Sequence, residues 1–167
     1  TTGRLSCKLG VMKDHLVLKA REILKNNIYC TLATVNTDGG PWASPVYYCI
    51  DPQHSLYFIS KTSSIHVQNM RNINTVSFAI FDSRQKEGMG NGIQGIGIAT
   101  ELRGTEIVEG LKWYRTSFAT LSKAFFRKPF GYRLFKLTPS EWYILDPNAE
   151  DDRRVKIELK TATTQKG

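Results

Sequence analysis

Hydroxyl, ammonium and imidazole groups lie close together in residues 60–66, which read Ser-Lys-Thr-Ser-Ser-Ile-His. A serine just before an apolar periodic segment is typical of a helix N-cap, so this cluster is predicted to open a short helix. Free backbone N–H groups at a helix N-terminus, together with such side chains, suit a phosphate group. The candidate phosphate ligands are Ser60, Lys61, Ser64 and His66. A plain helix cap is the alternative, because it needs only one of the serines.

A second segment offers backbone groups to a flat molecule. Trp42–Ile50 has the composition of a β-strand, but Pro45 interrupts it. Proline cannot donate to a strand ladder, so this point is an edge, a bulge or a place where a ligand meets the backbone. The groups that could bond a heterocyclic ring there belong to Ser44, Pro45, Val46 and Tyr47. The two segments together predict a site for a phosphorylated planar cofactor, with an ordinary edge strand as the alternative for the second.

Residues 90–95 read Gly-Asn-Gly-Ile-Gln-Gly and match the dinucleotide fingerprint G-x-G-x-x-G. That fingerprint needs a strand before it and a helix after it. Here two sets of residues alternate through residues 93–100, which predicts a strand and excludes the dinucleotide function. Gln94 remains a candidate, because its amide can both donate to and accept from a ring. The alternative is a surface glutamine on a strand whose small residues let another group approach closely.

The histidines and cysteines do not predict a metal site. They are scattered without metal-ligand spacing, as His15, His54 and His66, and as Cys7, Cys30 and Cys49. An odd number of widely spaced cysteines also argues against a disulfide framework, so we expect a reducing, cytoplasmic compartment. No G-x-S-x-G nucleophile motif is present.

The 167 residues, of which 41% are hydrophobic, predict one domain spanning 1–167 with loose ends at 1–11 and 161–167. No apolar run approaches the ~18 residues of a membrane helix, and the N-terminus lacks a signal-peptide core, so no membrane partner is expected. The net charge of +8 allows a nucleic-acid partner, and the densest basic stretch is Lys123–Lys136. A solvated face explains that stretch equally simply, and without a nucleic-acid-binding motif we do not expect nucleic acid.

These candidate residues need a scaffold of short strands and a few helices. Helical periodicity predicts helices over 12–27 and 107–121, besides the one that opens at Ser63 or Ser64. Alternation predicts strands over 29–36, 42–50, 56–60, 76–81, 93–102, 132–137 and 141–145, and an edge strand within 155–159. Turns are expected at 37–40 and at 138–140. Because strands do not alternate regularly with helices, we predict a mainly β fold, an antiparallel barrel with flanking helices.

Six motifs in order resemble the pyridoxamine 5′-phosphate oxidase-related family of FMN-binding split barrels. Within residues 16–103 they read Leu32-Ala-Thr-Val-Asn-x-Asp-Gly-x-Pro, Ser44-Pro-Val-Tyr-Tyr, Leu56-Tyr-Phe-Ile-Ser, Ser64-x-His-x-x-Asn-Met, Val76-Ser-Phe-Ala-Ile-Phe and Gln94-Gly-Ile-Gly-x-Ala. Each motif is weak alone, and the ordered set is specific. The resemblance implies a six-stranded antiparallel split barrel and a homodimer that holds FMN at the subunit interface.

The resemblance also implies roles for individual residues. It would place Ser44, Pro45, Val46 and Tyr47 along the isoalloxazine edge, Ser60, Lys61, Ser64 and His66 at the phosphate, Gln94 against the ring, and Trp142 as the aromatic residue that completes the site. The true oxidases carry an Arg-Lys pair where this chain has Ile65-His66. One fixed cation fewer should weaken phosphate binding, and pyridoxamine phosphate itself is not the expected substrate.

The resulting hypothesis is an FMN-binding flavoprotein, a flavin-dependent oxidoreductase of unknown substrate whose electron donor could be reduced nicotinamide. A non-catalytic flavin, haem or deazaflavin binding or sensor protein on the same barrel is the alternative. No catalytic side chain is assigned, because the flavin itself carries the electrons.

Overall fold

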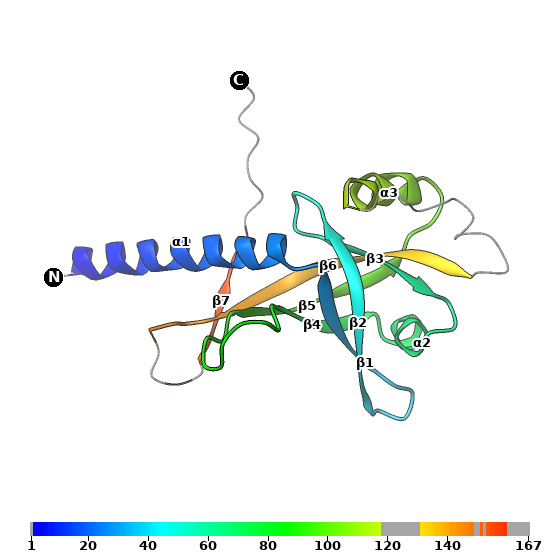
Figure 1. Ribbon diagram of the computed structural model, residues 1–167, viewed down its shortest axis with the longest axis horizontal. Helices are drawn as coiled ribbons and strands as arrows, with labels where there is room; N and C mark the ends of the chain where they lie inside the picture. The colour runs from blue at the N-terminus through cyan, green and yellow to red at the C-terminus, as the bar shows by residue number, and fades with distance from the viewer. Residues whose placement is uncertain (1, 118–130, 149–150, 152, 160–167) are drawn as a thin grey trace, which may run out of the picture.

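A computed structural model describes the backbone of residues 2–117, 131–148, 151 and 153–159. Its centre is one antiparallel sheet with strand order β3-β2-β1-β4-β5-β6-β7 (Figure 1). The strands are β1 (Tyr29–Val35), β2 (Pro41–Ile50), β3 (Leu56–Lys61), β4 (Thr75–Phe81), β5 (Gly92–Glu101), β6 (Tyr132–Leu145) and β7 (Arg154–Ile157). Because β3 also pairs with β6, the first six strands close into a barrel, as predicted, and β7 extends the sheet beside β6.

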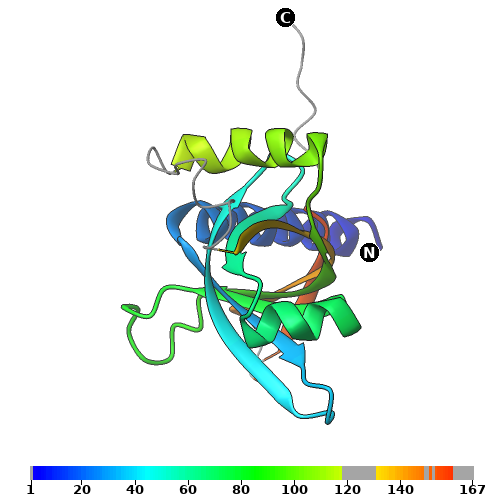
Figure 2. The same ribbon diagram turned by 90° about the vertical axis from the view of Figure 1, so that its right-hand side faces the viewer.

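Three helices flank the barrel. They are α1 (Thr2–Asn26), α2 (Ile65–Asn72) and α3 (Thr105–Ser117). Figures 1 and 2 show α2 and α3 on opposite sides of the barrel, with α1 extending away from it. The helix expected over 12–27 begins ten residues earlier, so residues 2–11 are helical rather than a loose end. The expected loose end at 161–167 lies outside the described residues.

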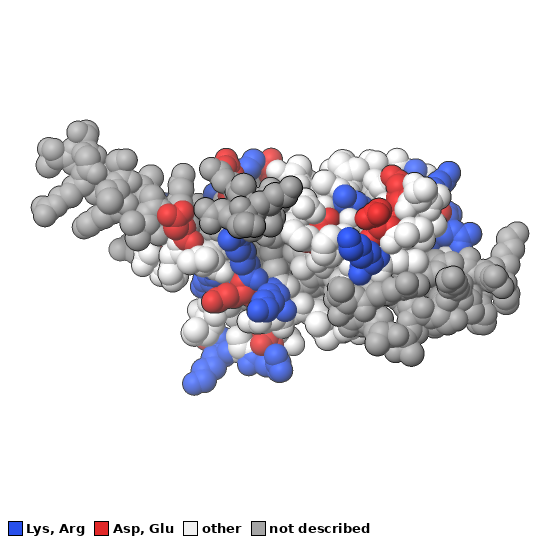
Figure 3. Space-filling view, turned by 90° about the horizontal axis from the view of Figure 1, so that it is seen from above, with Lys and Arg blue, Asp and Glu red and all other residues white. Residues whose placement is uncertain are grey.

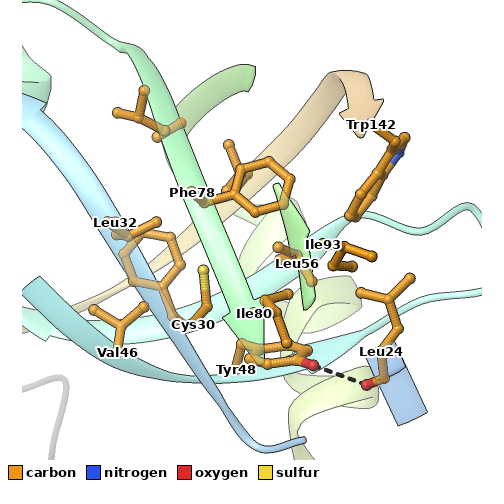
Figure 4. Packing of buried hydrophobic residues seen from close by; sticks show 14 of the residues in the cluster. Leu24, Cys30, Leu32, Val46, Tyr48, Leu56, Phe78, Ile80, Ile93 and Trp142 are labelled. Atoms are coloured by element: carbon orange, nitrogen blue, oxygen red, sulfur yellow. Dashed lines mark hydrogen bonds between the residues drawn. The ribbon is translucent and has the colours of Figure 1, made fainter. Parts of the chain in front are cut away.

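The barrel interior is filled by the alternate residues of each strand, as the period of two requires. Leu32, Leu56 and Ile80 are among its most buried side chains (Figure 4). The Tyr48 hydroxyl donates a 2.8 Å hydrogen bond to the carbonyl of Leu24. This buried bond fixes the C-terminal end of α1 against the barrel.

A second, smaller cluster lies between α3 and the outer side of β3. It contains Tyr57, Tyr114 and Leu134, with Ile107 and Leu111 packed against it. The apolar face predicted for this helix is therefore the face that packs. The final part of that prediction, residues 118–121, lies outside the described residues.

The segment predicted as two strands joined at residues 138–140 is a single strand, β6. Its pairing with β5 shifts register between Ile96 and Gly97, where Pro139 faces Gly97 and Glu141 faces Ile96. Ser140 is the extra residue, and its hydroxyl donates to the carbonyl of Ile96 at 3.1 Å. A β-bulge therefore absorbs the proline that the sequence pattern assigned to a turn.

The small residues of β5 let a neighbouring ring approach closely, as one reading of the sequence proposed. A Cβ atom on Gly95 would lie 2.3 Å from the Phe78 ring and 2.6 Å from the carbonyl oxygen of Glu141. The group that approaches Gly95 is therefore a core side chain rather than a ligand. Since β5 is a strand, the glycine run lacks the helix that a dinucleotide site needs.

Replacing Gly95 by Ala should lower the free energy of unfolding by about 3 kcal/mol or more, at the upper end for overpacking, because the backbone carbonyl cannot move aside. Gly110→Ala is the matched control. The nearest atoms to its Cβ would all belong to side chains, the ends of Leu102 and Leu134 at 2.7 Å and the ring of Tyr57 at 3.2 Å, and alanine favours the helix by about 1 kcal/mol. Urea unfolding of both variants measures the difference, and equal losses would contradict this account.

Candidate functional site

The barrel is split between β2 and β3. Only Tyr48–Ile50 of β2 pairs with β3, whereas all of β3 pairs with β6 on its other side. From Pro41 to Tyr47, β2 pairs with β1 alone among the described strands. Pro45 lies on this open edge, which confirms one of the three readings of the proline. The backbone groups on that side of β2 are available to a ligand.

Helix α2 begins beside the split, directly after β3. Ser64 is its N-cap residue, as predicted, but the side chain makes no capping hydrogen bond. The amides of Val67 and Gln68 both donate to the backbone carbonyl of Ser64 instead, at 3.0 and 3.1 Å. The amides of Ile65 and His66, which precede these two, have no acceptor within the helix. The Ser64 hydroxyl and these amides therefore form a donor group at the positive end of the helix dipole.

His66 and Ser60 form a hydrogen bond beside the N-terminus of α2. Nε2 of His66 lies 2.8 Å from Oγ of Ser60, whose residue is only 5% exposed. Burial lowers the pKa of His66 below its usual value. The imidazole is therefore neutral near pH 7, and it acts there by hydrogen bonding rather than by charge.

Lys61 does not share the side of β3 that carries Ser60. Tyr57 and Ile59 face the α3 cluster, and Lys61 follows them at the same period, whereas Phe58 and Ser60 face inward. Neighbouring residues of a strand point to opposite faces. Of the four predicted phosphate ligands, the structure brings Ser60, Ser64 and His66 together and directs Lys61 to the outer face.

Asn69 positions α2 and was missed by the sequence reasoning. This residue is 4% exposed, and its Nδ2 donates to Oγ1 of Thr34 at 3.0 Å and to Oδ1 of Asn36 at 2.8 Å. These two bonds fix α2 to β1. A weak helix former in the middle of a short helix was the available signal. Beside Asn69 lies a pocket of about 330 Å³ whose walls include Trp42 and Ile65.

The four predicted residues of β2 divide between the two faces. Val46 lies in the core and Ser44 is buried, where its Oγ accepts a 2.9 Å hydrogen bond from Nε1 of Trp42. Pro45 is exposed, and the ring of Tyr47 meets Tyr29 edge to face, with centroids 5.0 Å apart. Val46 can therefore offer a ligand only its backbone.

Gln94 lies on the outer face of the barrel, in one cross-strand row with Pro45. The register passes from Pro45 to Thr31, then to Ala79, Gln94 and Tyr143. Three strand spacings, about 14 Å, separate Gln94 from Pro45. Within one chain, Gln94 is therefore not part of the group around α2.

Trp142 does not share the face that carries Gln94. It lies in the barrel core, 6% exposed, with its ring edge to face against Phe78 at a centroid distance of 5.1 Å (Figure 4). The aromatic residue beside Gln94 is Tyr143, whose hydroxyl donates to Glu141. The period of two over 141–145 was the signal that could have identified it, because it puts successive residues on opposite faces.

The outer face also carries exposed apolar side chains from three adjacent strands. They are Tyr29 and Val35 on β1, Phe81 on β4, and Ile96 and Ile98 on β5. An apolar patch of this kind usually marks an interaction surface.

Charge is dispersed over the face of the molecule that Figure 3 shows. In Figure 3 acidic residues lie among the Lys and Arg side chains, without a continuous basic band on that face. Residues 123–130 of the basic stretch lie outside the described residues. Among the residues that the structure describes, no group of three His, Cys, Asp or Glu side chains could hold a metal ion, and no helix is long and apolar enough to cross a membrane.

Replacing Asn69 by Ala should lower the free energy of unfolding by about 1–3 kcal/mol, because buried Thr34 and half-buried Asn36 lose their donor. The neighbouring exposed residue supplies the control, and Gln68→Ala should stay within about 0.5 kcal/mol of the unaltered protein. Chemical denaturation of the three proteins checks this. An Asn69→Ala variant as stable as the control would show that these bonds do not fix α2.

Comparison with solved structures finds proteins that share this fold. Among solved structures, a haem-binding protein from Mycobacterium smegmatis has a TM-score of 0.67 and 20% identity, over 84% of this chain and 57% of that one. The haem storage protein HutZ from Vibrio cholerae has a TM-score of 0.66 and 15% identity, and the match covers 77% of this chain and 94% of HutZ. A Clostridium acetobutylicum protein related to general stress protein 26, of the pyridoxinephosphate oxidase family, has a TM-score of 0.61 and 12% identity, over 87% and 95%. At these identities the likeness shows the fold alone.

The sequence itself gives the family. The chain spans little more than half the length of the Mycobacterium smegmatis protein. No curated protein matches it. A family model described as pyridoxamine 5′-phosphate oxidase matches residues 16–146, which include all six strands of the barrel and leave out β7. The chain therefore belongs to the pyridoxamine 5′-phosphate oxidase family.

Proposed function

We propose that this protein binds FMN and acts as a flavin-dependent oxidoreductase. The observation that carries the proposal is the N-terminus of α2. There a cap serine makes no capping bond, and the Ser60–His66 pair lies within the same turn of chain. These donors suit a phosphate group, and they lie beside the open edge of β2, whose backbone groups suit a flat ring.

The residues present fit the phosphate of FMN with fewer charges than the true oxidases use. Ser60, Ser64 and His66 would hold it through hydrogen bonds and helix-end amides, with neutral His66 and exposed Ile65 in place of an Arg-Lys pair. Binding should therefore be weaker than with two fixed cations. When bound, the flavin would supply the electron-transfer chemistry, and the chain would supply binding and orientation.

A homodimer is part of the proposal. The exposed apolar side chains of β1, β4 and β5 form a surface that a second copy of the chain could cover. Gln94 and Tyr143 lie on this surface, so the dimer would bring them to an interface. The substrate is a small molecule with an electron donor such as reduced nicotinamide. Cys30 and Cys49 are free and buried, which agrees with the proposed cytoplasmic location.

A haem-binding function is the second candidate, because two of the similar structures are named as haem-binding and haem storage proteins. Haem iron needs a ligand such as a His or Cys side chain. Cys30 and Cys49 are buried, and burial raises the pKa of each thiol to about 12, so neither is a favourable ligand. Nε2 of His66 is already bonded to Ser60. These observations make Cys30, Cys49 and His66 poor haem ligands, and for the site at the N-terminus of α2 they favour FMN.

The cofactor can be identified directly. Protein purified from cells supplied with both riboflavin and haem precursor should show the two visible bands of oxidised flavin, and mass spectrometry of the released ligand should give FMN. Reduced nicotinamide should then bleach the flavin, and an acceptor should restore it. A Soret band without flavin would instead establish the haem function.

Replacing both Ser64 and His66 by Ala should weaken FMN binding by about 1–3 kcal/mol, the scale of hydrogen bonds to a charged group. Ser63→Ala is the matched control, because Ser63 is exposed and its backbone carbonyl, not its hydroxyl, accepts the bond from Gln68. Titration of the protein with FMN measures the affinities. An unchanged affinity in the double variant would refute the phosphate assignment.

The affinity should also depend on pH through His66. Burial lowers the pKa of His66, so the imidazole is neutral at pH 7. It gains its positive charge only when the pH falls below the usual pKa of a histidine. Positive charge attracts phosphate, so the affinity relative to His66→Gln should rise from pH 7.5 to pH 5.5. The ratio of the two FMN affinities, unaltered protein over His66→Gln, cancels the titration of the phosphate itself, because both proteins bind the same phosphate. A ratio that falls with decreasing pH would contradict this role.

A further inference from the structure

A cleft of about 510 Å³ lies between the C-terminal part of α1 and the end of β2 with its turn into β3. Figure 1 shows this turn beside the end of α1. The cleft is at the opposite end of β3 from α2, so it is separate from the proposed FMN phosphate site. Its walls include the apolar side chains of Leu24, Ile28 and Tyr47.

His54, in the wall of this cleft, has an unusual backbone. Its φ of 63° is the one positive value among the described residues other than glycine. Glycine adopts this conformation without strain, whereas a side chain there costs on the order of 1 kcal/mol. A histidine in this position suggests that its side chain has a use that outweighs the strain.

The imidazole of His54 presents a buried acceptor. Nδ1 is buried without a hydrogen-bond partner in the described residues. Burial and the nearby charge of Arg21 lower the pKa of His54, so the ring is neutral at pH 7. A neutral imidazole has one nitrogen without a proton, so Nδ1 can accept a bond from a ligand.

Two cations line the same cleft. Arg21 and Lys25 are four residues apart on α1 and so lie on one face of the helix. Asp51 is the acidic residue in the walls. Its carboxylate accepts bonds from the Ser55 amide at 2.8 Å and from the Tyr57 hydroxyl at 3.0 Å. The cleft therefore has an excess of positive charge, beside an acceptor and an apolar wall.

We propose that this cleft binds a small organic acid that carries a hydroxyl group next to its carboxylate and an apolar body. The carboxylate would face Arg21 and Lys25, and the hydroxyl would donate to Nδ1 of His54. The apolar body would lie against Leu24, Ile28 and Tyr47. The proposal does not depend on which cofactor occupies the other end of the barrel.

Three related probes separate these contacts. Mandelate has the carboxylate, the hydroxyl and the ring, phenylacetate lacks the hydroxyl, and methyl mandelate lacks the charge. Calorimetric titration of the full chain should show mandelate binding about fivefold tighter than phenylacetate, the scale of one neutral hydrogen bond, with the ester at least tenfold weaker. Binding of the ester equal to that of mandelate would overturn the proposal.

Substitutions assign the contacts to residues. His54→Gly should fold with equal or greater stability, because glycine relieves the positive φ, and it should bind mandelate and phenylacetate equally. Arg21→Gln should weaken both acids about tenfold, the effect expected when a charged partner is lost. A fivefold preference for mandelate that persists in His54→Gly would refute the role of His54.

A measurement on the unaltered chain keeps the test independent of folding. The ring nitrogen signals of His54 in NMR spectra should move when mandelate is added, with Nδ1 moving more than Nε2, because only Nδ1 gains a donor. Phenylacetate should leave Nδ1 unchanged. Signals that respond to neither acid would overturn the assignment even if both acids bind elsewhere.

Discussion

The pairing of β3 with β6 is the constraint on which the rest of the structure depends. β3 shares three residue pairs with β2 but six with β6, so it leaves β2 and follows β6. This closes the barrel and at the same time opens the split beside Pro41–Tyr47. Closure removes one exposed sheet edge, while the split keeps a short one that a ligand could use. The position of α2, directly after β3, follows from the same departure.

The period of two then sorts neighbouring residues into different environments. Ser60 turns toward His66 whereas Lys61 turns to the outer face, and Trp142 enters the core whereas Tyr143 joins Gln94 outside. Adjacent residues with similar chemistry thus have different uses. The inner member of each pair supports the fold or the split. The outer member lies outside the barrel, Lys61 on the side of β3 that faces the α3 cluster and Tyr143 beside Gln94.

The two ends of β3 present two neutral histidines in different ways. Burial lowers the pKa of both His66 and His54, so neither provides a fixed charge at pH 7. His66 is bonded to Ser60 at a helix N-terminus, where backbone amides supply the attraction for an anion. Nδ1 of His54 has no partner in the described residues, and Arg21 and Lys25 line the same cleft. In the two proposed sites, the attraction for an anion would therefore come from the helix end in one case and from α1 in the other.

The sequence alone determined the strands other than β6, which it divided in two at Pro139, and it also determined the helix that begins after Ser64 and the family. Alternation, cap residues and turn glycines are local signals. The sequence also excluded the dinucleotide function of the glycine run correctly, since the strand pattern continues through it. Only the tertiary structure decided which candidates meet. It separated Lys61 from Ser60, buried Trp142, and put Gln94 about three strand spacings, ~14 Å, from Pro45. It also revealed Asn69 and His54, because their roles rest on partners such as Thr34 and Arg21, more than thirty residues away in the chain.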